Sequence, residues 1–168
     1  MGTVNLLDCL KHQNKKTVCI IMTSDKCYEN SSLQRPHKET DPMGGYDPYS
    51  ASKGATELIV SSYRNSFFKY NTIKNNKVSI ASVRAGNVIG GGDWAKDRLI
   101  PDCIRSLTMK KPILIRHPDG IRPFQHVLEP ISGMLHLATK MWKEPTVFSQ
   151  SWNFGPLKKN KIKVKDIV

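Results

Sequence analysis

Tyr49 and Lys53 stand four residues apart at the start of a helical pattern that runs from Tyr49 to about Tyr70. Residues four apart lie on one face of a helix, so the phenol and the ammonium project together. A nearby ammonium favours the phenolate form of a tyrosine. Tyr49 is therefore a candidate base that takes a hydroxyl proton while hydride leaves the same carbon. The spacing is also common in exposed helical pairs without function, so its surroundings must decide.

A second group of polar side chains follows the apolar run Val18–Met22, which predicts a strand buried on both faces of a parallel sheet. Thr23, Ser24, Asp25 and Lys26 come directly after this run. Ligand-handling groups in parallel α/β sheets gather at the carboxyl ends of strands, where these residues supply a hydrogen-bond donor, an acid and a base. A capped turn is an equal interpretation, because serine and aspartate often bond their own backbone.

Together the two motifs resemble the extended short-chain dehydrogenase/reductase superfamily, whose members carry a hydroxyl residue at a strand end and a downstream Y-x-x-x-K. Longer strings narrow the resemblance to sugar-nucleotide dehydratases of the CDP-glucose 4,6-dehydratase family. The resemblance runs nearly from end to end of the chain. The strings are Thr23–Tyr28, Pro42–Ser50, Arg84–Trp94, Arg98–Pro101, Ile121–Val127 and Trp152–Gly155.

This resemblance implies NAD-dependent dehydration of CDP-glucose to CDP-4-keto-6-deoxyglucose, a hydro-lyase reaction. It implies Tyr49 as the oxidation base, with Lys53 as its partner at the nicotinamide ribose. It implies that Ser24 bonds the hydroxyl at sugar carbon 4. Asp25 is then the acid and Lys26 the base for eliminating water across carbons 5 and 6. Because a lysine is a base only when neutral, we expect Lys26 to be buried or to lie near Lys53.

The resemblance also implies a set of binding residues. Arg84 is expected at the cofactor, and Asn87 near cofactor and substrate. Arg98, Arg122 and Asn153 match positions that hold the nucleotide diphosphate, and Leu99 belongs to the same substrate-binding stretch. A guanidinium offers two parallel donors to phosphate oxygens. No metal site is expected, since the cysteines and histidines lack metal-ligand spacing.

Alternating strand and helix patterns predict an α/β domain built as a partial Rossmann-like parallel sheet with helices on both faces. The expected strands are Val18–Met22, Val78–Val83, Ile113–Ile115 and Trp152–Phe154. The expected helices are Met1–Leu10, Tyr49–Tyr70, Arg98–Met109 and Glu129–Trp142. The second helix is predicted to bury one face, made of Ala55, Leu58, Ile59, Ser62, Tyr63 and Phe67.

We expect residues 1–95 to form the C-terminal half of the NAD-binding domain, with the catalytic residues. Residues 96–168 are expected to form part of the sugar-nucleotide-binding region, interleaved with that core. The glycine-rich NAD loop of the family has no counterpart, because Gly90–Gly92 lacks the G-x-G-x-x-G spacing. We therefore predict a fragment without the first strands of the sheet, and little or no activity from this chain alone.

The net charge is +12, from 26 basic and 14 acidic side chains. The lysines form short groups, such as Lys15-Lys16, Lys110-Lys111 and Lys158-Lys159, which are typical of solvated turns rather than of a nucleic-acid interface. No signal peptide and no run of about 20 apolar residues is found, which predicts a cytoplasmic protein with no membrane contact. The four scattered cysteines indicate reduced thiols.

Two alternatives stay open at this stage. One is a fragment of an NAD-dependent sugar-nucleotide epimerase, which the Asp25-Lys26 pair disfavours because epimerases need no elimination acid and base. The other is a non-catalytic, basic binding remnant. The resemblance further implies a homodimer formed through helices 1–12 and 49–68.

Overall fold

The computed structural model describes residues 1–29, 35–70, 76–156 and 162–168. Its contacts separate into two compact units. The first comprises Met1–Ala85 and Ile131–Phe154, and the second comprises Gly86–Pro130 and Gly155–Val168. These limits differ from the predicted division at residue 95, because the chain returns to the first unit after Pro130 and packs there against the sheet.

The first unit contains a parallel sheet of β1 (Thr17–Met22), β2 (Val78–Ala85) and β6 (Ser151–Phe154), in the order β1-β2-β6. Thr17 pairs with Val78 at one end of the β1–β2 register, and Met22 pairs with Val83 at the other. Every residue of the central strand β2 is buried. A strand that is buried along its whole length requires cover on both faces.

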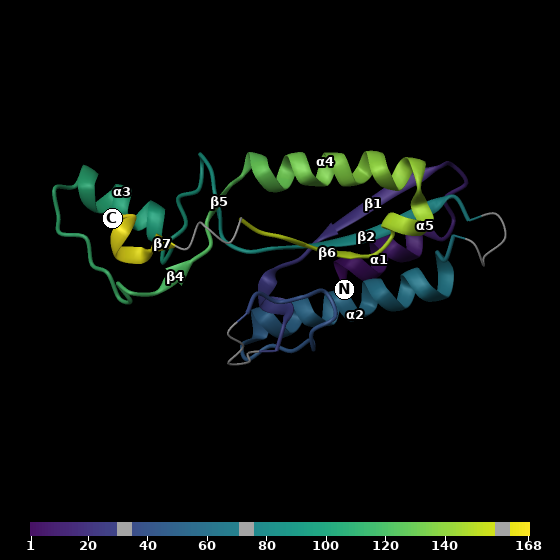
Figure 1. Ribbon diagram of the computed structural model, residues 1–168, viewed down its shortest axis with the longest axis horizontal. Helices are drawn as coiled ribbons and strands as arrows, with labels where there is room; N and C mark the ends of the chain where they lie inside the picture. The colour runs from purple at the N-terminus through teal and green to yellow at the C-terminus, as the bar shows by residue number, and fades with distance from the viewer. Residues whose placement is uncertain (30–34, 71–75, 157–161) are drawn as a thin grey trace. The chain divides into compact units, whose positions relative to one another are not determined.

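Helices cover both faces of this sheet (Figure 1). On one face lie α1 (Gly2–Leu10) and α2 (Pro48–Phe67), and on the other lies α4 (Leu128–Lys143), followed by the short α5 (Pro145–Phe148). The predicted α/β class, with a parallel sheet between helices, is confirmed. One core cluster consists of Leu7, Val60, Phe68, Val78 and Ile80, and the other of Ala81, Val83, Leu137 and Met141. None of the helices in the described ranges is both long and apolar enough to cross a bilayer.

The predicted buried face of α2 is largely wrong. Ala55, Ser62 and Phe67 are exposed, and Leu58 is 61% exposed. The residues of α2 that are buried are Ser50, Gly54, Glu57 and Val60. Small side chains allow the helix to approach the sheet closely, and the buried glutamate meets polar partners there. A prediction that counted only apolar side chains could not detect such a face.

The second unit contains short elements. β3 (Val88–Ile89) pairs in parallel with β5 (Gln125–His126), and β4 (Ile121–Arg122) pairs antiparallel with β7 (Ile162–Lys163). Its helices are α3 (Leu99–Thr108) and the 3₁₀ turn η2 (Val164–Asp166). The predicted strand at Ile113–Ile115 is not formed, because this segment has no partner strand among the described residues and Leu114 is 85% exposed.

Asn76 ties the region after α2 to the start of β2. Its side-chain amide donates to the carbonyls of Phe68 at 2.8 Å and Val78 at 2.9 Å, and its carbonyl oxygen accepts from the Val78 N–H at 2.9 Å. We expect Asn76→Ala to lower the free energy of unfolding by about 1–2 kcal/mol, because backbone groups lose their partners. Urea denaturation measures this change, and Asn14→Ala, at an exposed position, is the control. Equal midpoints for the two variants would contradict the prediction.

Candidate functional site

The start of α2 presents Tyr49 and Lys53. Asp47 caps the helix, since its carboxylate accepts from the Ser50 N–H at 3.0 Å and from the Ser50 hydroxyl at 2.7 Å. These bonds lower the pKa of Asp47. Pro48 begins the helix, where its missing N–H costs nothing. Tyr49 is 53% exposed, and the Lys53 ammonium lies 5.6 Å from the centre of its ring, as the four-residue spacing predicts.

The polar residues after β1 form a short 3₁₀ turn, η1 (Asp25–Cys27). Ser24 caps this turn: its hydroxyl accepts from the Lys26 N–H at 3.2 Å and donates to the Asp25 carboxylate at 3.1 Å. The capped-turn interpretation is thus confirmed, and it leaves the side chains of Asp25 and Lys26 exposed. Of the two conditions expected for Lys26, burial or a place near Lys53, burial is absent.

Close packing brings the two motifs to the same end of the sheet. A methyl group added to Gly54 would lie 2.9 Å from the Gly44 carbonyl oxygen and 3.2 Å from that of Cys27. The helix therefore touches the backbone of η1 and of the loop before α2 at a position where only glycine fits. Tyr49, Lys53 and Ser24 consequently lie on elements that contact each other at the carboxyl end of β1.

A buried charged network lies beneath these residues and was not predicted. Glu57 is 2% exposed and Arg84 is 4% exposed, and their side chains are 2.7 Å apart. The Glu57 carboxylate also accepts from the hydroxyls of Thr23 at 2.5 Å, Ser82 at 2.8 Å and Ser151 at 3.3 Å. In the sequence, Glu57 could have been noticed only from its position. It follows Lys53 by one helical turn and lies on the face of α2 that carries the small residues Ser50 and Gly54.

The pKa of Glu57 reflects two opposing effects. Burial raises it, but the hydrogen bonds from Arg84, Thr23 and Ser82, with the charge of Arg84, outweigh burial and bring the pKa below its ordinary value. For Arg84, burial lowers the pKa, while the bonds to Glu57 and Tyr28 bring it above the ordinary value. Both groups therefore stay charged at neutral pH.

Asn153 and Arg84 were predicted to contact ligands, and here both have partners inside the first unit. One nitrogen of Arg84 donates to the Tyr28 hydroxyl at 2.7 Å and to the Glu39 carbonyl at 2.9 Å. The Tyr28 hydroxyl donates to the Asn153 side-chain oxygen at 2.6 Å, and the Asn153 amide donates to the His37 carbonyl at 3.0 Å. These bonds fasten the segment before α2 to the end of β6.

Stability is expected to fall in acid. The described carboxyl groups with a resolved shift all have lowered pKa values, which are those of Asp8, Asp41, Asp47, Glu57 and Asp119. A lowered folded-state pKa contributes stability above the unfolded value, about 4, and this contribution is lost as pH falls through the folded value. We expect the urea midpoint to be lower at about pH 3 than at about pH 7. An unchanged midpoint would contradict this prediction.

The remaining predicted residues belong to the second unit. Asn87 accepts from the Gln125 N–H at 3.0 Å through its backbone carbonyl, and Leu99 begins α3. Arg98 pairs with Asp93 at 3.1 Å. Arg122 is exposed on β4.

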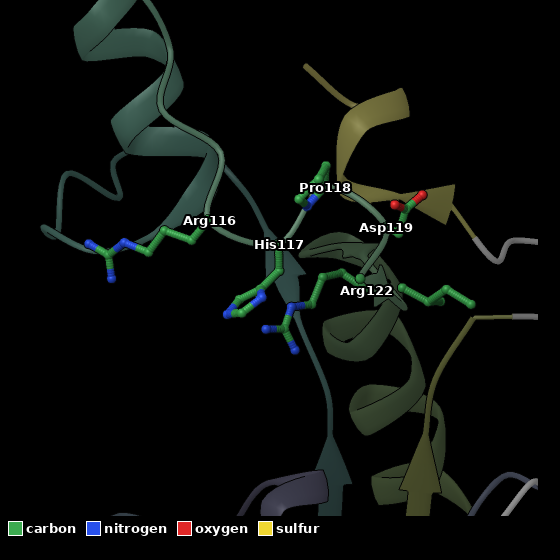
Figure 2. Close-up of a pocket in the computed structure, with 7 residues that line it drawn as sticks. Arg116, His117, Pro118, Asp119 and Arg122 are labelled. Carbon is green, nitrogen blue, oxygen red and sulfur yellow. The ribbon is translucent and has the colours of Figure 1, made fainter.

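Arg122 lines a pocket of about 390 Å³ together with Arg116, His117 and Asp119. The side chains of His117 and Arg122 extend to the same side of the loop (Figure 2). Asp119 is held by Lys165 at 2.9 Å and by Lys163 at 3.3 Å, and these bonds lower its pKa. Its charge is thus largely neutralised by lysines. Arg116 pairs with Asp97 at 2.7 Å, so Arg122 and His117 remain to meet an anion.

Comparison with known proteins gives a family match over most of the chain. The family model described as "NAD dependent epimerase/dehydratase family" matches residues 1–150. The chain is similar to CDP-glucose 4,6-dehydratase of Salmonella typhimurium, with 53% identity over 156 residues. That match covers 93% of this chain and 44% of the relative, so the chain spans less than half of the relative's length.

Solved structures give the same fold. UDP-glucuronic acid 4-epimerase from Bacillus cereus in complex with NAD superposes with a TM-score of 0.80 at 20% identity, over 100% of this chain and 49% of that chain. dTDP-glucose 4,6-dehydratase from Bacillus anthracis in complex with NAD superposes with a TM-score of 0.69 at 22% identity, over 92% and 45%. At these identities the likeness concerns the fold alone.

Proposed function

Because the chain belongs to the NAD-dependent epimerase/dehydratase family, we propose that it is the catalytic part of an enzyme that dehydrates CDP-glucose to CDP-4-keto-6-deoxyglucose. The observation that carries this proposal is the close packing of α2 on η1. It sets Tyr49 and Lys53 on an element that contacts the one bearing Ser24, Asp25 and Lys26. The identity of 53% to the Salmonella typhimurium dehydratase supports the choice of substrate.

The residues of this chain supply the proton transfers. Tyr49, with Lys53 on the same face of α2, takes the proton of the hydroxyl at sugar carbon 4, which Ser24 holds. NAD, when bound, supplies the hydride acceptor for carbon 4 and the donor that later reduces carbon 6. The resulting ketone acidifies the proton on carbon 5, and removal of this proton is assigned to Lys26. Asp25 protonates the departing hydroxyl at carbon 6, which leaves as water.

The available groups at the start of α2 fit NAD. Neither the Tyr49 hydroxyl nor the Lys53 ammonium has a hydrogen-bond partner within the described part of the chain, so both can meet the nicotinamide ribose. In the second unit, Arg98 and Arg122 would hold the nucleotide diphosphate, with Asn87 and Leu99 nearby. Arg84 and Asn153 would act indirectly, by holding Glu57 and Tyr28 in place.

The proposal includes a homodimer in the cytoplasm. α1 and α2 contact each other, and the Tyr63 hydroxyl donates to Asp8 at 3.0 Å. Leu6 and Leu58 on these two helices are exposed, and exposed apolar groups of this kind favour association. All four cysteines are free, in keeping with a reducing compartment.

A sugar-nucleotide epimerase is the second candidate, because the Bacillus cereus epimerase shares the fold with a TM-score of 0.80. An epimerase oxidises and reduces the same carbon and needs no elimination. Asp25 and Lys26 supply an acid and a base side by side, which favours the dehydratase. The two candidates differ in their products, since only the dehydratase releases water.

A chimera tests the proposal. In it, this chain replaces the matching region of the Salmonella typhimurium protein, and the product of CDP-glucose and NAD is followed by its absorbance in alkali. We expect a 4-keto-6-deoxy product from CDP-glucose. A folded chimera that yields none, while the unaltered Salmonella protein does, would overturn the proposed function. Epimerised product without loss of water would favour the epimerase.

Lys26→Met in the chimera tests the role of the exposed lysine. We expect kcat to fall about 100-fold, the lower end of the usual contribution of a general base, because water partly replaces an exposed amine. The melting temperature should stay unchanged, because the Lys26 side chain is exposed. Lys15→Met, at another exposed lysine, is the control for lost charge. Normal dehydration by Lys26→Met would assign the base to another group.

A further inference from the structure

The segment that bears Ser24, Asp25 and Lys26 is held at both of its ends by one buried ion pair. Thr23, the residue before it, donates to Glu57 at 2.5 Å. Tyr28, two residues after Lys26, accepts from Arg84 at 2.7 Å. Glu57 belongs to α2 and Arg84 to β2, so the pair joins the turn to the helix and to the central strand.

On the basis of the proposed function, we propose that Glu57 and Arg84 are positioning residues of the dehydratase. Their ion pair fixes where α2 lies along the sheet and how the helix is rotated about its axis. It also fixes the position of η1 relative to α2. It thereby fixes Tyr49 and Lys53 relative to Ser24. Neither side chain needs to touch substrate or NAD for this role.

The bonding pattern of Glu57 explains how one carboxylate sets the register. Its donors come from three strands: Thr23 at the end of β1, Ser82 and Arg84 on β2, and Ser151 on β6. An apolar side chain in its place would tolerate a slide of the helix along the sheet. The Glu57 carboxylate does not tolerate such a slide, because a shift of about 1 Å breaks its directional hydrogen bonds.

The position of Glu57 on α2 transmits this constraint to the proposed site. Glu57 follows Lys53 by one helical turn and Tyr49 by two, on a helix that rises about 1.5 Å per residue. A slide at Glu57 therefore moves Tyr49 by the same amount. A misplacement of about 1 Å at a reacting group can reduce the rate about 100-fold.

Stability alone gives no reason for the pair. Removing two charges from water is costly, and apolar side chains of similar volume often stabilise a fold at least as well. The first unit already contains two apolar clusters, one on each face of the sheet. Arg84 also leaves its Nε without a hydrogen-bond partner among the described residues. The cost of burying this ion pair is explained if the pair serves to position α2 and η1.

The test separates positioning from folding by removing both charges at once. The chimera is prepared with Glu57→Gln, with Glu57→Met/Arg84→Met, and with Glu144→Gln as the control at an exposed carboxylate. We expect Glu57→Gln to lower both the melting temperature and kcat, with KM nearly unchanged. The double variant should regain most of the melting temperature while kcat stays 10- to 100-fold low, roughly the cost of a slide of under 1 Å. Recovery of kcat together with the melting temperature would overturn the proposal.

Two further measurements cover the other outcomes. If the double variant does not fold, Thr23→Val keeps the shape of a buried side chain and removes the hydroxyl that bonds Glu57 at 2.5 Å and lies 3.3 Å from the Val83 carbonyl. It should lower kcat several-fold with little change in melting temperature, and unchanged kcat would overturn the proposal.

If the unaltered chimera makes no product, the proposed function fails on its own. Amide hydrogen exchange in this chain then reads the positioning directly. We expect faster exchange at residues 23–28 in Glu57→Gln than in Glu144→Gln, and equal exchange would overturn the inference.

Discussion

Tyr49→Phe is expected to reduce kcat of the chimera by about 10³–10⁴, near the upper limit for loss of a positioned base. The substitution removes one oxygen and leaves the ring in place. The hydroxyl has no hydrogen-bond partner among the residues that the structure describes, and the side chain is half exposed. The melting temperature should therefore stay the same, and KM for CDP-glucose should change little. Product absorbance in alkali, measured under saturating substrate, gives kcat.

Tyr46→Phe is the matched control for this experiment. Tyr46 precedes α2, is 95% exposed and is not on the helical face of Lys53. It should retain the full rate. If both variants kept the rate, or if both lost it with a lower melting temperature, Tyr49 would not be the base. The comparison thus separates loss of a proton acceptor from general disturbance of the loop.

Much of the first unit could be predicted because its elements depend on local patterns. The run Val18–Met22 forms β1 within one residue, and Val78–Val83 lies within β2. The pair Tyr49–Lys53 shares a face because helical geometry determines that spacing. The strand at Ile113–Ile115 was wrong because an apolar run forms a strand only where a partner backbone is available.

The polar interior could not be predicted, because it depends on contacts between residues far apart in the chain. Glu57 meets Thr23, 34 residues earlier, and Arg84, 27 residues later. Asn153 meets Tyr28 across 125 residues. No periodicity encodes such pairs, and a charged residue on a helix is usually exposed. The expected ligand contacts of Arg84 and Asn153 therefore stay predictions. In this structure their side chains bond neighbouring protein groups.

Gly45→Ala is expected to have the largest effect on stability among the substitutions considered. A methyl group at Gly45 would lie 2.2 Å from the Ala51 nitrogen, 2.5 Å from the Ser50 carbonyl carbon and 2.6 Å from the Ala51 Cα. These are backbone atoms of the first turn of α2, so no side-chain rotation relieves the clash. We expect a loss of about 3 kcal/mol, at the upper end for overpacking. For a chain of this size, the melting temperature should fall by roughly 6–12 °C.

Neither side of this contact can move cheaply. The loop is fixed by the bond from the Gly44 N–H to the Cys27 carbonyl at 2.9 Å, and the helix by the close packing of Gly54 on Gly44. Whichever side yields, Tyr49 shifts relative to η1, so kcat of the chimera should fall together with stability. Gly91→Ala is the control, since a methyl group there meets nothing within 4 Å. Equal melting temperatures and equal kcat for the two variants would mean that the loop before α2 is looser than this packing requires.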